Sequence, residues 1–155
     1  MKYRQLTKEQ LENLHKEFAL FLASQEIDAK EWTRIKEKKP TLVEKEINLF
    51  SDVVWEDVLT KTNYLEHFSK KSINLFKCDK KRIQRLVIQV NKKINLLEKE
   101  DFDWLLSHPK ESVIEYLKGS KNYKKERNTE IFDLIEKGSN ISNRELFEFF
   151  TQLVS

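Results

Sequence analysis

The sequence predicts a helix-rich α+β fold, with N-terminal helices, a small central antiparallel β-meander and C-terminal helices. Apolar residues recur at helical spacing in both outer thirds, whereas the middle holds short aromatic and β-branched runs separated by lysine-containing turns. The hydrophobic content of 39% is adequate for a core, and the chain has no linker or low-complexity segment. We therefore expect a single globular domain over residues 1–155, with an all-α fold as the alternative.

The N-terminal third carries the same helix-start signal twice. Thr7 is followed by Gln10, and Asp28 by Glu31, so each start pairs a capping side chain with a reciprocal one three residues later. The second helix should be short because Pro40 follows it, and a third helix should begin near Pro40 and run for about 20 residues. Off its apolar stripe this third helix is acidic, at Glu44, Glu46, Asp52, Glu56 and Asp57.

Three strands are predicted in the middle of the chain, over residues 64–68, 73–78 and 83–90. Their residues are rich in aromatic or β-branched types, and Ser-Lys-Lys-Ser and Asp-Lys-Lys turns separate them. A helix over about residues 80–98 is the competing interpretation, because the apolar residues of that stretch also fit helical spacing. The β-prone run from Leu86 to Ile88 favours the sheet.

Residues from Asp101 onward are predicted to be helical again. The expected helices are one before Pro109, one from Pro109 up to Gly119, one from about Asn122 to Lys137, and a last one that starts at Ser142. Gly119 and Gly138 each follow a lysine at the end of a helical pattern, where the left-handed C′ position favours glycine.

The residue inventory argues against familiar enzyme classes. The two glycines are not clustered, so the phosphate-binding and dinucleotide-binding loops that require grouped glycines are missing. Glu12 and His15 have the spacing of a di-iron ligand pair, but no second copy of that pair exists. Cys78 is the only cysteine, which excludes an intrachain disulfide, and no local base accompanies it as a nucleophile would need. We predict a non-enzyme with no cofactor and no metal.

The N-terminus lacks the apolar stretch of a signal peptide, and no apolar run approaches the ~20 residues that span a bilayer. We therefore expect a cytoplasmic protein with no membrane partner, and a lone thiol suits such a reducing compartment.

Segregated positive charge is the main functional clue. Between Lys70 and Lys93 nine basic residues face one acid, Asp79, which gives this segment a net charge of +8 in a chain of net charge +3. The candidate binding residues are Lys70, Lys71, Lys77, Lys80, Lys81, Arg82, Arg85, Lys92 and Lys93. Phe68 and Phe76 lie nearby in the sequence and could stack bases. A second cluster, Lys118, Lys121, Lys124, Lys125 and Arg127 with Tyr123, could extend the surface.

These observations favour a small non-enzymatic binding or regulatory protein that acts through protein–protein interaction. Its acidic third helix and basic middle could meet opposite charges on a partner, and an exposed Trp55 or Phe147 could anchor the interface. The alternative is nucleic-acid binding, with RNA as the acidic polymer, through segment 70–93. Basic residues that converge in one unneutralised patch would favour nucleic acid, whereas an exposed apolar patch with a charged rim would favour a protein.

Short motifs along nearly the whole chain resemble a known family. They are Met1-Lys2-Tyr3-Arg4 with Leu6-Thr7, Phe50-Ser51-Asp52, Tyr64-Leu65-Glu66-His67, Leu75-Phe76-Lys77-Cys78-Asp79 and Lys125-Glu126-Arg127-Asn128. The chain is similar to an uncharacterised domain-of-unknown-function family of Bacteroidota bacteria. The resemblance implies a small bacterial cytoplasmic protein, and it carries over no catalytic or binding residue.

Overall fold

Seven helices and five strands make up the structure, a computed structural model that describes residues 1–155. The predicted α+β class is confirmed, and the all-α alternative is wrong. Contacts within the chain divide it into an N-terminal unit, Met1–Thr60, and a C-terminal unit, Lys61–Ser155, and each is described by itself. The single domain over 1–155 stays a prediction. No helix combines the length and the apolar character that crossing a membrane requires.

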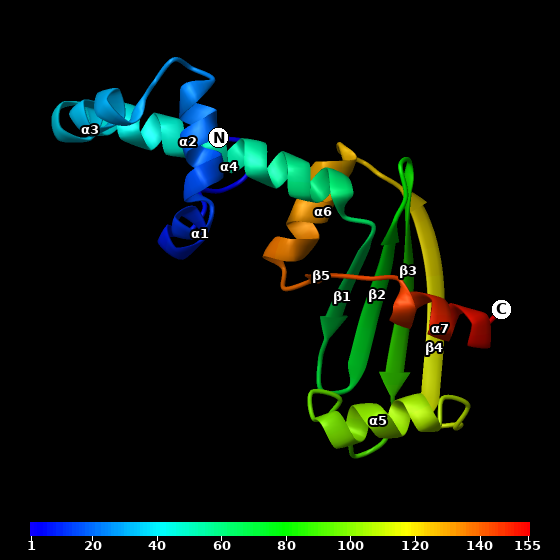
Figure 1. Cartoon of the computed structure of the whole chain (residues 1–155). Helices are drawn as coiled ribbons and strands as arrows, with labels where there is room; N and C mark the ends of the chain where they lie inside the picture. The colour runs from blue at the N-terminus through cyan, green and yellow to red at the C-terminus, as the bar shows by residue number, and fades with distance from the viewer. The chain divides into compact units, whose positions relative to one another are not determined.

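The N-terminal unit is built from helices whose start signals work as predicted. The helices are α1 (Lys8–Asn13), α2 (His15–Ala23), α3 (Ala29–Lys38) and α4 (Pro40–Lys61), labelled in Figure 1. Thr7 and Gln10 form a complete capping box, and the Asp28 carboxylate accepts the Glu31 N–H at 2.8 Å. The predicted first helix is interrupted at Leu14, where the backbone leaves helical geometry and separates α1 from α2.

Aromatic packing joins the helices of this unit. The Phe50 ring of α4 lies 5.0 Å from Phe18 and 5.4 Å from Phe21, and Phe18 meets Trp32 edge to face at 5.4 Å. Ser51 is fully buried and tied on both sides, since its hydroxyl accepts the Leu6 N–H and donates to a carbonyl of α4.

Several acidic residues of α4 have partners within the N-terminal unit. Asp52 accepts the backbone N–H groups of Lys2 and Tyr3, at 2.7 and 2.9 Å, and Glu46 is buried and accepts a hydrogen bond from Gln25 at 2.8 Å. The acidic side of this helix therefore serves its own fold as well as facing solvent.

The C-terminal unit is organised around one antiparallel sheet in the order β4-β3-β2-β1-β5. Its strands are β1 (Tyr64–Phe68), β2 (Ser72–Cys78), β3 (Arg82–Val90), β4 (Ile114–Asn122) and β5 (Asn140–Ser142). The three predicted strands are confirmed, with ends that agree within one residue, and the competing helix over 80–98 is wrong. Helices α5 (Lys99–Ser107), α6 (Arg127–Glu136) and α7 (Glu145–Leu153) complete the unit.

The helix predicted from Pro109 to Gly119 is wrong, because most of this segment belongs to β4. The strand pairs with β3 over nine residues, from Ile114 opposite Val90 to Asn122 opposite Arg82. Ile114 and Tyr116 alternate onto the buried face, so the segment also fits a period of two, and pairing with a neighbouring strand outweighs a weak helical pattern. Gly119 is accordingly a strand residue and not a helix C′ residue.

The C′ role of Gly138 is confirmed. Its φ is +111°, the Gly138 N–H bonds to the Ile135 carbonyl, and the Ser139 N–H bonds to the Leu134 carbonyl. These two bonds form a Schellman motif that ends α6. The last helix starts later than predicted, since Ser142 belongs to β5 and the Asn143 side chain accepts the Glu145 N–H at 3.0 Å.

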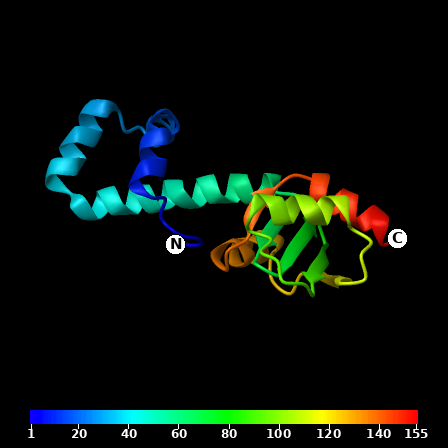
Figure 2. The same cartoon turned by 90° about the horizontal axis from the view of Figure 1, so that it is seen from below.

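Helices cover the two faces of the sheet. Helices α5 and α7 pack on one face over a core that includes Ile73, Leu86, Ile88, Leu105 and Phe150. The turned view in Figure 2 shows α7 and α5 above the strands and α6 below them. Alternation along each strand therefore sends one set of side chains to the α7 core and the other set to the α6 side.

Arg127, at the start of α6, anchors this helix to the sheet. Its guanidinium donates hydrogen bonds to the backbone carbonyls of Thr62, Cys78 and Asp79, and the Tyr123 hydroxyl donates to the Asp79 carbonyl at 2.8 Å. Burial raises the pKa of Tyr123 to about 12, so this hydroxyl keeps its proton near neutral pH. Arg127 and Tyr123, which belong to the second predicted cluster, therefore stabilise the fold of this unit.

Candidate functional site

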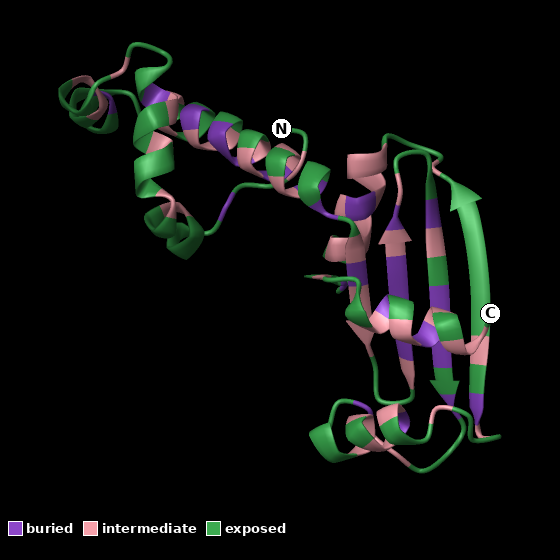
Figure 3. Cartoon of the chain, turned by 45° about the vertical axis from the view of Figure 1, so that its right-hand side comes forward, coloured by how far each residue is buried: buried purple, intermediate pink, exposed green.

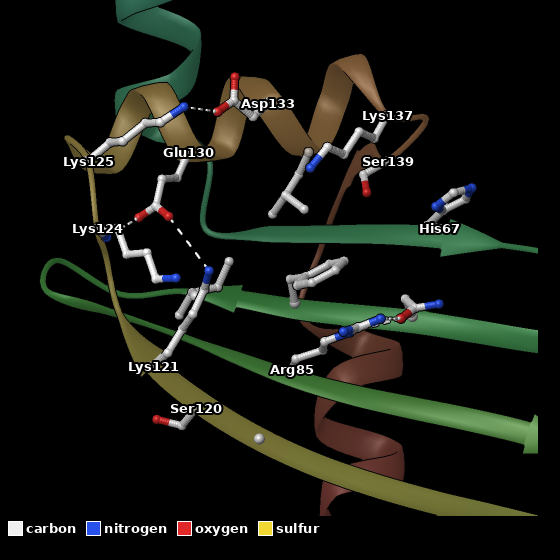
Figure 4. A pocket seen from close by; sticks show the side chains of 15 residues that line it. His67, Arg85, Ser120, Lys121, Lys124, Lys125, Glu130, Asp133, Lys137 and Ser139 are labelled. Atoms are coloured by element: carbon white, nitrogen blue, oxygen red, sulfur yellow. Dashed lines mark hydrogen bonds and ion pairs between the residues drawn. The ribbon is translucent and has the colours of Figure 1, made fainter.

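A hollow of about 840 Å³ lies between α6 and the sheet, and Figure 4 shows the side chains that line it. We call it the α6 hollow. From the strands it takes His67, Asn74, Phe76, Ile83, Arg85, Gly119, Ser120 and Lys121; from the loop before α6, Lys124 and Lys125; and from α6 and the turn after it, Glu130, Asp133, Leu134, Lys137 and Ser139.

Strand alternation places most of the sheet residues in the hollow. In β2, Ile73 and Leu75 enter the α7 core, so Asn74 and Phe76 face the other way. The register continues this face across the sheet, since Phe76 pairs with Arg85 and Arg85 pairs with Gly119.

The hollow carries an excess of positive charge. Arg85, Lys121, Lys124, Lys125 and Lys137 line it, with Glu130 and Asp133 as its carboxylates. Lys121 lies 3.7 Å from Glu130, and Lys125 lies 3.1 Å from Asp133. No carboxylate pairs with the side chains of Arg85, Lys124 and Lys137, so three cations remain for an anionic ligand.

The Arg85 guanidinium is held in a defined orientation. Its Nε and Nη2 both donate to the Asn74 side-chain oxygen, at 2.9 and 2.6 Å, and the group lies 5.8 Å from the centre of the Phe76 ring. Arg85 is exposed, and arginine carries five N–H donors, so the remaining donors are free to meet a carboxylate or phosphate in a fixed geometry.

His67 borders the hollow where α6 ends. A Cβ atom at Gly138 would lie 3.3 Å from its Nε2, so the imidazole occupies space that glycine leaves open. No group of three His, Cys, Asp or Glu residues in the chain could hold a metal ion. The cations that line the hollow could attract a negatively charged group.

The nine basic residues predicted from segment 70–93 do not share one surface. Lys70 and Lys71 lie in the turn before β2 and Lys92 and Lys93 follow β3, where the Lys71 ammonium donates to the Lys92 carbonyl. The others lie elsewhere: Lys80 and Lys81 in the turn after β2, Lys77 and Arg82 on the α7 side of their strands, and Arg85 in the α6 hollow.

The second predicted cluster contributes more to the hollow. Lys121, Lys124 and Lys125 line it, whereas Lys118 pairs with Leu86 on the opposite face. Lys137 is a lining cation that sequence reasoning missed, because only the packing of α6 on the sheet brings it to the hollow that Arg85 lines. The alternation of residues 114–122 also fits a strand, and this signal could have placed Lys121 on the same face of the sheet as Arg85.

Of the aromatic residues considered for binding, all but the half-buried Phe68 and Tyr123 are buried. Phe76 is 8% exposed, and Phe68 packs against the α7 core, with its ring 5.3 Å from Phe102. Trp55 and Phe147 are also buried, so the expectation that either is an exposed anchor is wrong.

Cys78 is buried as well, and burial raises the pKa of its thiol to about 12. A thiol this hard to ionise is a poor nucleophile.

Comparisons with known proteins support one part of the sequence resemblance, the membership of a family of unknown function. No curated protein and no solved structure matches the chain. One family model, described as "Family of unknown function (DUF6495)", matches residues 1–155. Because that match covers the whole sequence, the chain belongs to this family of unknown function.

Proposed function

We propose that the chain is a small non-enzymatic binding protein that acts through protein–protein interaction and receives an acidic segment of its partner in the α6 hollow. The observation that supports this proposal is the set of three cations, Arg85, Lys124 and Lys137, that have no carboxylate partner in a hollow of about 840 Å³. A charge-assisted hydrogen bond is roughly twice as strong as a neutral one, and a pre-oriented arginine binds carboxylates with both energy and direction.

The lining of the hollow supports a peptide more than a nucleic acid. The half-buried Leu134 adds apolar surface beside the cations, which a peptide side chain could contact. Single-stranded nucleic acids bind with bases stacked on exposed aromatic rings, whereas Phe76 is buried and the half-buried Phe68 packs against the α7 core. The nine basic residues of segment 70–93 lie on several surfaces. The structure therefore supports the RNA alternative less than the charge of this segment in the sequence did.

We further propose that the protein is bacterial and cytoplasmic, as the resemblance to a Bacteroidota family implies. A single buried thiol is consistent with a reducing compartment.

The test compares two charge-reversed variants in affinity purification from the native cells, with and without nuclease. Lys124→Glu with Lys137→Glu reverses two unpaired cations of the hollow. Lys93→Glu with Lys110→Glu makes the same change in net charge at two exposed lysines of the same unit outside the hollow. Circular dichroism of both variants controls for folding.

We expect a nuclease-resistant protein partner that the hollow variant loses and the control variant keeps. Nuclease-sensitive recovery of RNA or DNA would contradict the proposal in favour of the alternative. A protein partner that the two variants bind equally would show that the hollow is not the interface.

A further inference from the structure

The strand β4 forms an open edge of the sheet beside the α6 hollow. It pairs with β3 on one side only, because it is the first strand in the order of the sheet. Figure 3 shows β4 exposed along most of its length, and Gly119, Ser120 and Lys121 belong both to this strand and to the hollow. Strands at sheet edges present unpaired backbone groups to other chains.

The hydrogen bonds at its two ends show which backbone groups of β4 point outward. The Tyr123 N–H bonds to the Lys81 carbonyl, and the Asn91 N–H bonds to the Val113 carbonyl. In an antiparallel ladder the residues that exchange such bonds alternate, so the odd-numbered residues of β4 face β3. The N–H and C=O groups of Tyr116, Lys118, Ser120 and Asn122 are directed away from the sheet.

Native edges are commonly blunted by proline or by a bulge, and β4 has neither. Its protection is charge, since Lys118 and Lys121 lie on the strand with one acid, Glu115. A second copy paired antiparallel about Lys118 would place the two Lys118 side chains directly opposite each other, which destabilises a sheet. The same charges attract an acidic strand.

Gly119 opens a path from this edge to Arg85. The two residues are direct neighbours in the register, and a Cβ atom at Gly119 would meet no atom within 4 Å. A side chain of an added strand, about 4.8 Å beyond β4, can therefore extend over Gly119 toward the guanidinium. Lys121 lies two residues along on the same face, and Leu117, 57% exposed, lies two residues the other way.

We propose that the outer edge of β4 binds an extended acidic segment of the partner by antiparallel strand addition, with acidic side chains passing over Gly119 to Arg85 and Lys121. This inference rests on the proposed function and names the form of the partner. An apolar side chain opposite Leu117 completes the recognition pattern, and Glu115 disfavours an acid further along.

The probe is a fluorescein-labelled peptide, Val-Glu-Val-Glu-Val-Leu-Val, measured by fluorescence anisotropy against the full chain. In the antiparallel register its two glutamates stand opposite Lys121 and Gly119, and its leucine stands opposite Leu117. With glutamate on the hollow side, the valine residues stand opposite the even-numbered residues of β4 and exchange the backbone hydrogen bonds. N-methylation of the valine amides should therefore weaken binding by at least about tenfold, the equivalent of one well-made hydrogen bond. N-methylation of the glutamate amides should change it less than about twofold.

A protein variant tests the same edge. Ser120→Pro removes one outward N–H and leaves the ladder with β3 intact, since proline is tolerated on the solvent side of an edge strand. Ser120→Ala is the matched control, because it loses the same hydroxyl and keeps the N–H. We expect Ser120→Pro to weaken binding at least about tenfold and Ser120→Ala less than about twofold. The methylated peptides decide the question if Ser120→Pro does not fold.

Several results would overturn strand addition. Strand addition fails if methylation of the valine amides and methylation of the glutamate amides weaken binding equally. If only methylation of the glutamate amides weakens binding, the proposed antiparallel register is refuted. If Lys124→Glu with Lys137→Glu loses the peptide while Ser120→Pro keeps it, strand addition fails and the proposed function stands. If neither variant matters, both fail. If labelled oligouridine binds more tightly than the peptide, the ligand of this edge is a nucleic acid and strand addition by a peptide fails. If sedimentation velocity shows a dimer that Ser120→Pro abolishes, the edge of β4 pairs with a second copy of the chain instead.

Discussion

Replacing Arg127 by methionine should destabilise the C-terminal unit more than any other charge removal near α6. The guanidinium donates to the backbone carbonyls of Thr62, just before β1, and of Cys78 and Asp79, at the end of β2. Methionine keeps the length and the apolar stem of the side chain but offers no donor. The substitution therefore isolates the hydrogen bonds from the packing.

The magnitude follows from the three carbonyl groups that lose a charged donor. A hydrogen bond to a charged group contributes about 1.5–3 kcal/mol, but the side chain is half-buried, so water can reach part of the site. Taking about 1 kcal/mol for each carbonyl gives a loss of about 3 kcal/mol in the free energy of unfolding. For a unit of this size that corresponds to a fall of about 15 °C in Tm.

The assay is urea unfolding followed by far-ultraviolet circular dichroism, with Lys125→Met as the matched control. Lys125 lies two residues away, is exposed and pairs with Asp133 at 3.1 Å. Exposed ion pairs contribute little, so the control should lose less than about 0.5 kcal/mol. If Arg127→Met and Lys125→Met lower the urea midpoint equally, the anchoring role of Arg127 is refuted.

Other substitutions test separate features. Burial raises the pKa of the Cys78 thiol from its ordinary 9.0 to about 12, so above pH 9 the unfolded chain loses this proton before the folded one. Stability should therefore fall from pH 9 toward 12, and Cys78→Ala should reduce that fall in urea titrations. Gly138→Ala should lower stability by about 1–2 kcal/mol because its φ is +111° and His67 lies close, whereas Gly119→Thr should raise it by about 0.5 kcal/mol. Thermal unfolding would distinguish the two, and equal signs would contradict the assignment of Gly119 to a strand. Thr151→Val should raise Tm, since the buried Thr151 hydroxyl has no hydrogen-bond partner.

Local signals were enough for most elements of the fold. The capping residues Thr7 and Asp28 predicted two helix starts, and Gly138 predicted a helix end, because each of these depends only on neighbours in the sequence. The segment from Ile114 to Asn122 depends on a partner strand that ends 24 residues earlier, at Val90. Its apolar residues fit both periods, so the sequence alone could not decide between them.

The candidate site could likewise be predicted only in part from the sequence. Arg85 was predicted from charge density, and Lys121, Lys124 and Lys125 were noted as a possible extension. Neighbours in the sequence separate in a hairpin, since adjacent strand residues point to opposite faces and successive turns lie at opposite ends. For this reason the basic residues of segment 70–93 are divided among several surfaces, with Arg85 in the α6 hollow and Lys71, Lys92 and Lys93 around a separate one.

The two carboxylates of the α6 hollow act as ligands that the protein already carries. Glu130 and Asp133 occupy Lys121 and Lys125, and both acids belong to the helix that roofs the hollow. If an acidic group binds Lys121 as proposed, it competes with Glu130, and binding there becomes an exchange of one anion for another. Under the proposal, such exchange would favour rapid release over tight capture and would free α6 from part of its attachment to the sheet.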